Sequence, residues 1–563
     1  MMRCHTVMRC PIKATPGRKQ LPACIAALFA LAAPGAGHAS TWTVNSCDGE
    51  LVSGDSLTKT GTLRFALANA ADTDTIELAG LSGTCSKITL TTGALAAAQP
   101  GLTLHGPGYN SLTIDASSLA HGPNVQNRVL THSGNGRLKI DSLALEGGYV
   151  NHSSGYGGCV YSAGNVRLDN ALVSGCTAYD KSGSARGGAV FAKGYAIMAT
   201  SFVLGSSALS STGTAKGGGL FANTGIILSA SEIAGSTAKS GGDVSGGGVY
   251  STAALEADSS FITGNTAYST NGDATGGGAY AKTDMTLNAA LVSGNKAEPA
   301  VGHTSTGGGI RSGGNFYSVY TTISNNRVYA FGYGGGVYLK GGTHSLKNTT
   351  VSGNQARFSA GVDVFTGGGP SAALVLTNAT ISGNNASQSN GGLFSDAANT
   401  QFWNSTIAFN TAGSGAGVVL AANLHALDVK LYDTVISNNT GGGSEYDLAT
   451  IGANTVTFNG GADEGVNLVR VTPLTTLPPT KTIKGACPRL GPLRDNGGFV
   501  QTHALTSGSA AIDIGENPLH LIRDARGPGY LRISGLSSMA DLGAYEVQQN
   551  DIVFDAGFDD CPP

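Results

Sequence analysis

The stretch Phe261-Ile262-Thr263-Gly264-Asn265-Thr266-Ala267, followed by Thr275-Gly276-Gly277-Gly278-Ala279-Tyr280, decides the fold, because both phrases return about every thirty residues. Copies of the glycine phrase begin 30, 30, 29, 30, 31 and 27 residues apart. A repeat of this period is one supersecondary unit that buries its apolar side chains only by stacking on its neighbours. The sequence therefore predicts a solenoid. The copies start at Tyr156, Arg186, Lys216, Ser245, Thr275, Thr306 and Tyr333.

Short segments of alternating apolar and polar residues lie between the phrases, as in residues 165–171 and 285–291. Period-two alternation with β-branched residues favours strands over helices. Three short strands in a turn of just under thirty residues are typical of a parallel β-helix, in which equivalent strands pair about 4.8 Å apart. We expect an all-β fold, a single-stranded right-handed parallel β-helix, with handedness following the usual crossover rule.

The fifth position of the first phrase is an asparagine in many copies. In the first six repeats this position lies 17 residues after the third glycine position of the glycine phrase, so the two phrases keep a constant spacing. Stacked coils would place these amides in a ladder, each hydrogen-bonded to the next coil and satisfying backbone groups at a corner. The glycines would supply positive φ at tight corners. We favour a structural role over ligand binding for Asn265, Asn295, Asn326, Asn354, Asn384 and Asn410.

The two phrases together resemble the repeat of polymorphic outer membrane proteins, which pairs a GGA(I/L)-type string with FxxNxA. Residues 261–267 match closely, whereas most other copies replace the phenylalanine with Thr, Leu or Val. Residues 41–118 resemble the CSLREA-type N-terminal region of bacterial surface β-helices, with TLRFA in place of the name-giving string. This resemblance implies a capping helix near residues 62–70 and a pectin-lyase-like solenoid.

Near the C-terminus, four strings closely resemble the choice-of-anchor Q domain: LGPLRDNGGFVQTHAL from Leu490, SAAIDIG from Ser509, RDARG from Arg523 and ADLGAYE from Ala540. The resemblance implies an exported bacterial protein whose anchoring signal differs between lineages. Within these strings, Asp524, Arg526 and His503 are expected to be structural.

The expected organisation has five parts. Residues 1–39 read as a signal peptide, with five basic residues, an apolar run over 24–33 and small residues before the cleavage point. Export to the cell surface, the outer membrane or the medium follows, and lipidation at the LPAC string is less favoured. Residues 40–118 would form the N-terminal cap and first coils, 119–470 the repeats of about 25–31 residues, 471–547 the choice-of-anchor Q-like region and 548–563 an acidic tail.

Charge and cysteine content narrow the partners and the compartment. The chain carries a formal charge of −3, and the first 39 residues contain five of its basic residues and none of its acidic ones. Nucleic acid is therefore an improbable partner. Six cysteines remain outside the signal, an even number that suggests disulfides but leaves fifteen connectivities open. The pairs we favour are Cys47 with Cys85, Cys159 with Cys176, and Cys487 with Cys561.

Enzymatic chemistry has little support in the sequence. Lys and Arg are sparse in the coils with no apparent register, and no aligned charged cluster is recognisable. Acidic residues near the turns lack the spacing of a calcium repeat, so neither a cofactor nor a metal is predicted. Small polar loops before the glycine phrases would form a flat flank suited to glycan or protein contact. The acidic residues considered are Asp180, Asp243, Asp273 and Glu298.

We therefore interpret the chain as an exported surface or secreted β-helix that acts in adhesion, or in contact with glycans or proteins, without catalysis. It would be a monomer without a transmembrane segment, and its partner an extracellular glycan or a host or cell-surface protein. The alternative is a polysaccharide lyase or hydrolase of the pectin-lyase-like type. A third reading is a structural role in an envelope layer.

Overall fold

The computed structural model describes residues 39–551, apart from 52–59, 368, 370–371, 443–445, 459–464, 479–480, 535–536 and 550. The expected signal peptide, most of the expected acidic tail, and Cys561 lie outside the described residues. The chain from Ser40 onwards forms one compact unit, and the description below is confined to it.

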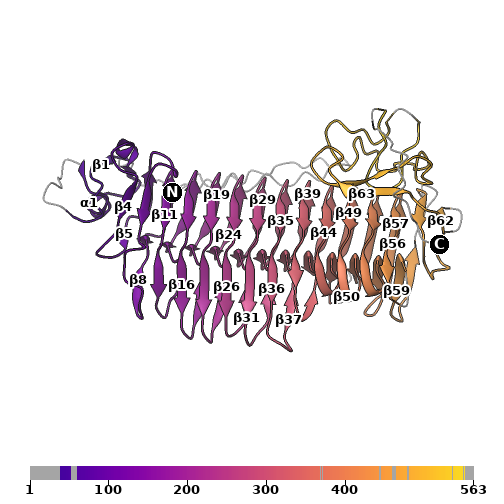
Figure 1. The fold of residues 1–563 in the computed structure, drawn as a ribbon, viewed down its shortest axis with the longest axis horizontal. Helices are drawn as coiled ribbons and strands as arrows, with labels where there is room; N and C mark the ends of the chain where they lie inside the picture. Colours follow the sequence, from indigo (N-terminus) through magenta and orange to yellow (C-terminus); the bar gives the residue numbers. More distant parts are fainter. Residues whose placement is uncertain are drawn as a thin grey trace, which may run out of the picture. The chain divides into compact units, whose positions relative to one another are not determined.

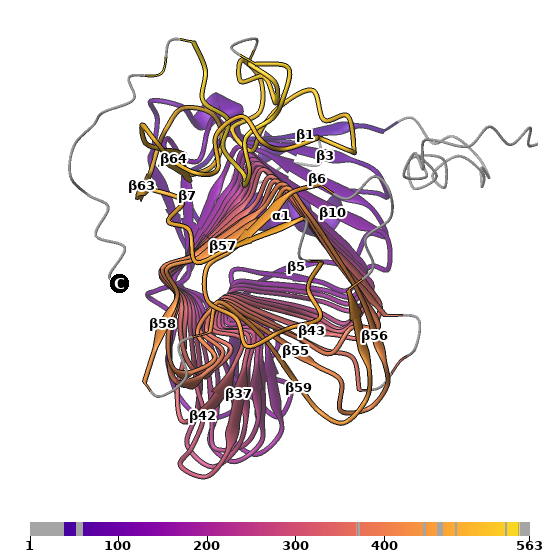
Figure 2. The ribbon, with the colours of Figure 1, turned by 90° about the vertical axis from the view of Figure 1, so that its right-hand side faces the viewer.

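The unit is a parallel β-solenoid, which confirms the predicted fold class. Within the described residues, equivalent strands of successive coils pair in parallel and build sheet A of 16 strands, sheet B of 15 strands and sheet C of 13 strands. In one coil, β29 (Leu255–Asp258) belongs to sheet A, β30 (Phe261–Thr263) to sheet B and β33 (Ala279–Ala281) to sheet C. Leu255, Ile262 and Ala279 point into the core, and each is at most 1% exposed. Figure 2 shows the three sheets as separate walls.

A fourth sheet corrects the expectation of three strands per coil. Between sheets B and C the same coil adds β31 (Thr266–Ser269) and β32 (Ala274–Thr275), which form an arm that projects at the bottom of Figure 2. The arm has its own core of small residues, including Ala267 and Ala274, both fully buried. The segments expected to be polar loops are thus partly strands, whose inward side chains are alanines and valines packed in this small core.

The asparagines of the first phrase form a continuous buried ladder. Nδ2 of Asn295 donates to Oδ1 of Asn326 at 2.9 Å, and Nδ2 of Asn326 donates to Oδ1 of Asn354 at 3.0 Å. The same amides also satisfy backbone groups, since the Asn295 N–H donates to Asn326 Oδ1. The sequence analysis missed the last two members, Asn439 and the terminating carboxylate of Asp447. The ladder runs through Asn265, Asn295, Asn326, Asn354, Asn384, Asn410, Asn439 and Asp447.

The residue before each asparagine of the ladder adopts the left-handed conformation that favours glycine. Gly264 has φ 62° and Gly353 has φ 65°. At the glycine phrase the constraint is space, because a Cβ on Gly277 would lie 2.3 Å from the carbonyl oxygen of Gly308 in the next coil. The recurring glycines therefore keep both corners tight.

Two disulfides join the pairs favoured for the first four cysteines. Cys47 is bonded to Cys85, and Cys159 is bonded to Cys176 with Cα atoms 5.4 Å apart. Cys159 occupies a glycine position and Cys176 an asparagine position of one coil, so the bond links two corners of that coil. The third expected pair, Cys487 with Cys561, includes a residue outside the described part of the chain.

The two ends of the unit differ from its middle. At the N-terminal end lie β1 (Thr41–Val44) and α1 (Leu63–Asn69), a helix whose first turn is capped by Thr62 Oγ1, which accepts from Phe65 N–H. At the other end, the chain leaves sheet B after β62 (Thr482–Lys484) and folds back over the outer face of that sheet, as Figure 1 shows for the segment with β63 (Leu490–Arg494).

We predict that removing one amide from the middle of the ladder lowers the free energy of unfolding. Asn354→Ala deprives the Asn326 and Asn384 side chains of buried partners, and the expected loss is about 1–3 kcal/mol. Asn288→Ala, at an exposed position of sheet A, is the control and should cost less than about 0.5 kcal/mol. Denaturant unfolding followed by circular dichroism measures both. Equal losses in the two variants would contradict a stabilising ladder.

Candidate functional site

A groove lies between the outer face of sheet B and the hairpin formed by β63 (Leu490–Arg494) and β64 (Thr502–Leu505). Its volume is about 1030 Å³. The floor is built by short strands one coil apart, and the roof by the hairpin and its connecting loop. The floor strands are β30 (Phe261–Thr263), β35 (Leu291–Ser293), β40 (Thr322–Ser324), β45 (Thr350–Ser352) and β49 (Thr380–Ser382), and the floor ends at Phe409, directly after β53 (Thr406–Ala408).

The hairpin is held on the sheet by buried hydrogen bonds. Ser382 Oγ lies 2.7 Å from His503 Nε2, and His503 Nδ1 lies 2.7 Å from the Gly491 carbonyl oxygen. A carbonyl can only accept, so Nδ1 carries the proton and Nε2 accepts from the serine hydroxyl. Thr350 Oγ1 adds a bond of 2.7 Å to the Gln501 carbonyl oxygen. The roof of the groove is therefore fixed to the coils at several points.

The residues that receive the C-terminal region depart from the repeat. The first two floor strands, β30 and β35, begin with Phe261 and Leu291. Each later floor strand begins with a threonine, the first of which is Thr322 in β40. At the left-handed corner between sheets A and B, Asn348 Nδ2 donates to the Asp524 carbonyl oxygen, and Asp433 Oδ2 accepts from Asn517 N–H at 2.7 Å. The sequence did not lead us to this docking surface. Its signal was the change to threonine at the start of the sheet B strands and to Asn or Asp at the corner between sheets A and B.

The groove presents hydroxyls and aromatic rings, with little charge. Serines of neighbouring coils form a row along the floor, and Ser324 Oγ donates to Ser293 Oγ at 3.2 Å. Among the described lining residues, Asp495 is the one carboxylate, and no lysine or arginine takes part. The aromatic lining residues are Phe261, Tyr320, Phe409 and Phe499.

Two of these aromatic residues hold backbone conformations that bulky side chains rarely adopt. Tyr320 has φ 49° and Phe409 has φ 58°, both in the left-handed region. Phe409 stands where Gly353 and Gly383 precede the ladder in the two preceding coils, and its side chain is 36% exposed. Its ring centroid lies 5.0 Å from that of His503. Such a conformation costs about 1 kcal/mol and persists where something else requires the side chain.

The Ser382–His503 pair has the hydrogen-bond order of a nucleophile and its base. Burial argues against that role, because Ser382 is 2% exposed and His503 is 3% exposed. Burial also lowers the pKa of His503 to about 4, which keeps the imidazole neutral. As expected from the sequence, His503 is buried and hydrogen-bonded. The pair serves to dock the hairpin.

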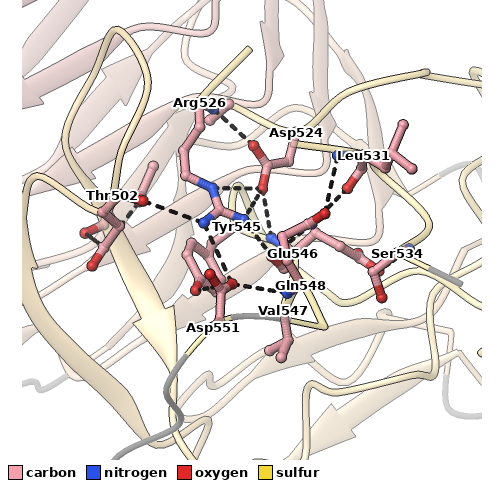
Figure 3. Close-up of polar contacts among 12 residues, drawn as sticks. Thr502, Asp524, Arg526, Leu531, Ser534, Tyr545, Glu546, Val547, Gln548 and Asp551 are labelled. Atoms are coloured by element: carbon pink, nitrogen blue, oxygen red, sulfur yellow. Dashed lines mark hydrogen bonds and ion pairs between the residues drawn. The ribbon is translucent and has the colours of Figure 1, made fainter. Parts of the chain in front are cut away.

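The charged residues of the C-terminal strings form a closed cluster, shown in Figure 3. Arg526 Nη2 lies 2.7 Å from Asp524 Oδ2, and its guanidinium lies 3.9 Å from the centroid of the Tyr545 ring. Burial, together with repulsion from Asp541, raises the pKa of Glu546 to about 8, against the lowering effect of Arg532. Because Asp524 and Arg526 are 0% exposed, the cluster is structural and reaches no substrate.

The structure corrects the statement that basic residues show no register. Arg186 pairs with Lys216 in adjacent coils, and Arg311, Tyr338 and Asp363 occupy equivalent positions of three successive coils. Asp363 is 3% exposed, and burial raises its pKa to about 7, with repulsion from a second buried aspartate adding to the effect. The middle position of this alignment is a neutral tyrosine and its carboxyl group is enclosed, so it is no exposed row of charged residues.

The acidic residues near the turns remain separate from the groove. Asp180 Oδ1 accepts from Gly183 N–H at 2.8 Å, and Asp273 Oδ1 accepts from Thr304 N–H at 2.8 Å, so both organise loops. Within the described part of the chain, no group of three or more His, Cys, Asp or Glu residues could hold a metal ion. The same residues include no helix long and apolar enough to span a membrane.

We predict that acid weakens the docking of the hairpin through His503. The folded protein keeps the imidazole neutral down to about pH 4, whereas the unfolded chain takes up a proton near its ordinary pKa of 6.5. This contribution is complete above pH 6.5 and is lost as the pH falls towards 4. His503→Gln should remove that part of the pH dependence of the thermal midpoint. His121→Gln, at an exposed position, should leave it unchanged, and identical pH profiles for wild type and His503→Gln would refute the prediction.

We predict that the buried carboxyl group of Asp363 has the opposite effect on the pH dependence of stability. Its pKa is about 7 when folded and 3.8 in its ordinary state, so the unfolded chain releases the proton first. Stability from this group is present below about pH 4 and decreases as the pH rises through 7. Asp363→Asn should therefore raise the thermal midpoint at pH 8 more than at pH 4. The exposed Asp258→Asn provides the control, and a uniform shift at both pH values would contradict burial of the proton.

The chain was compared with known proteins in three ways. No protein-family model, no curated protein and no solved structure matches it.

Proposed function

We propose that the protein is an exported bacterial β-helix that works at the cell surface or in the medium by binding a glycan or a protein, without catalysis. The observation that carries the proposal is the groove beneath the β63–β64 hairpin. It is large enough for a polymer segment, and several coils and a separate C-terminal region cooperate to build it.

The resemblances support export and surface attachment. The phrases similar to polymorphic outer membrane protein repeats supply the ladder and the glycine corners. The strings similar to the choice-of-anchor Q domain supply the docked region: RDARG contributes Asp524 and Arg526, and QTHAL contributes His503. Residues 1–39, read as a signal peptide, and the two disulfides fit an oxidising compartment.

The chemistry of the groove supports binding over turnover. Hydrolysis of a glycosidic bond ordinarily requires two carboxyl groups about 5–9.5 Å apart, and the described lining contains one, Asp495. Elimination from a uronate requires a base together with a cation or calcium. The histidine of the lining, His503, has both ring nitrogens engaged in docking. A lyase or hydrolase is the alternative.

We predict that the purified protein binds a polysaccharide or a surface protein and leaves it chemically unchanged. Binding is measured by affinity electrophoresis and by co-sedimentation with bacterial and host cell-surface preparations. Turnover is measured with and without calcium, by unsaturated uronate absorbance and by new reducing ends. Retention without either product is expected. Product formation would establish the alternative, and the absence of both binding and product would overturn the proposal.

A further inference from the structure

We propose that the groove beneath the hairpin binds an uncharged polysaccharide chain, lying along the solenoid axis with its sugar rings against Phe261 and Phe409. This inference rests on the proposed function and specifies the ligand of the same groove.

The groove has the length of a polymer segment. Its lining runs from Phe261, in β30, to Phe409, which follows β53. These two coils are five coil steps apart, and at about 4.8 Å a step the groove extends about 24 Å. A single sugar would fill a small part of that length. The repeating floor also offers a similar surface at each step, which suits a ligand that is itself a repeat.

The charge of the groove favours a neutral ligand. A uronate chain would bring several carboxylates over a lining whose described ionised group is Asp495, and no lysine or arginine of that lining could compensate them. A neutral chain meets no such cost. Its hydroxyls can exchange hydrogen bonds with the half-buried serines of the floor, Ser293 and Ser324.

The Phe409 ring lies where the repeat does not require an aromatic side chain. Gly353 and Gly383 occupy the same corner in the two preceding coils and Asn438 in the following one, yet Phe409 occupies it at φ 58° and is 36% exposed. Phe261, at the aromatic position of the repeat phrase, is 47% exposed on the floor of the groove. Aromatic faces bind the C–H faces of sugar rings, because the negative face of the ring attracts the weakly positive hydrogens.

A peptide is a less suitable occupant. Peptides that extend a sheet require a free strand edge, but the floor strands are paired with coils on both sides, as β40 is with β35 and β45. The floor therefore presents side chains, with its backbone groups already bonded. Binding of a surface protein is retained as an outcome of the experiment.

Two substitutions toward the residue of a neighbouring coil provide the test. Phe409→Gly restores the glycine of the repeat and relieves the left-handed strain, and Phe261→Leu copies Leu291 of the next coil. Both should keep the thermal midpoint within about 3 °C of the wild type. The control is Tyr195→Ser, which removes a ring that is 45% exposed on sheet A outside the groove lining.

The full-length protein and the variants are titrated with a neutral glucan, mannan, xylan and galactan, and with polygalacturonate and alginate, by affinity electrophoresis. At least one neutral polymer should bind, and each groove substitution should weaken that binding about tenfold, with no change for Tyr195→Ser. The inference is overturned if no neutral polymer binds, or if the groove variants bind it as the wild type does. Retention of an acidic polymer or a surface protein alone would overturn the inference and leave the proposed function standing.

Discussion

Hydrogen bonding between equivalent groups of adjacent coils is the interaction on which the rest of this solenoid depends. Backbone groups pair in this way along the sheets. At the corner after sheet B the amides of residues such as Asn326 and Asn354 pair in the same way. A buried amide is satisfied only if both neighbouring coils present a partner at the same place. This requirement fixes the path from sheet A to the ladder in the coils that carry the amides. Coil length varies elsewhere, in the arm and in the connection from sheet C to sheet A.

The arm shows how the length of this part of the coil varies. It has two strands in each of the middle coils, but from β46 (Gln355–Phe358) onwards a coil contributes one strand to the fourth sheet. The ladder continues through the change without interruption, from Asn354 to Asn384. The arm therefore shortens where its core consists of small residues such as Ala267 and Ala274, while the path from sheet A to the ladder keeps its length, because an unpaired buried amide would cost more.

The sequence was sufficient for the features that every coil repeats. The period, the glycine corners and the asparagines were read directly, because each has a local physical reason that recurs. The arm was read as loops, since an alternation such as Thr-Ala-Tyr-Ser over residues 266–269 is short and its buried residue is a small alanine. The groove could not be predicted, because it depends on the distant pairing of Ser382 with His503, which are 121 residues apart.

Residues that depart from the repeat indicate contacts other than those that stack the coils. Some of them have a partner that explains them: Asn348 and Asp433 meet the backbone of the C-terminal region, and Thr350 meets Gln501. The cysteines at positions 159 and 176 replace a glycine and an amide with a covalent bond. Phe409 is different, because its ring contacts His503 and still leaves a third of its surface open to the groove. A strained aromatic residue is poorly explained by docking alone, since the two preceding coils have glycine at the same corner and the following coil has Asn438. A ligand that uses the exposed face supplies the missing reason.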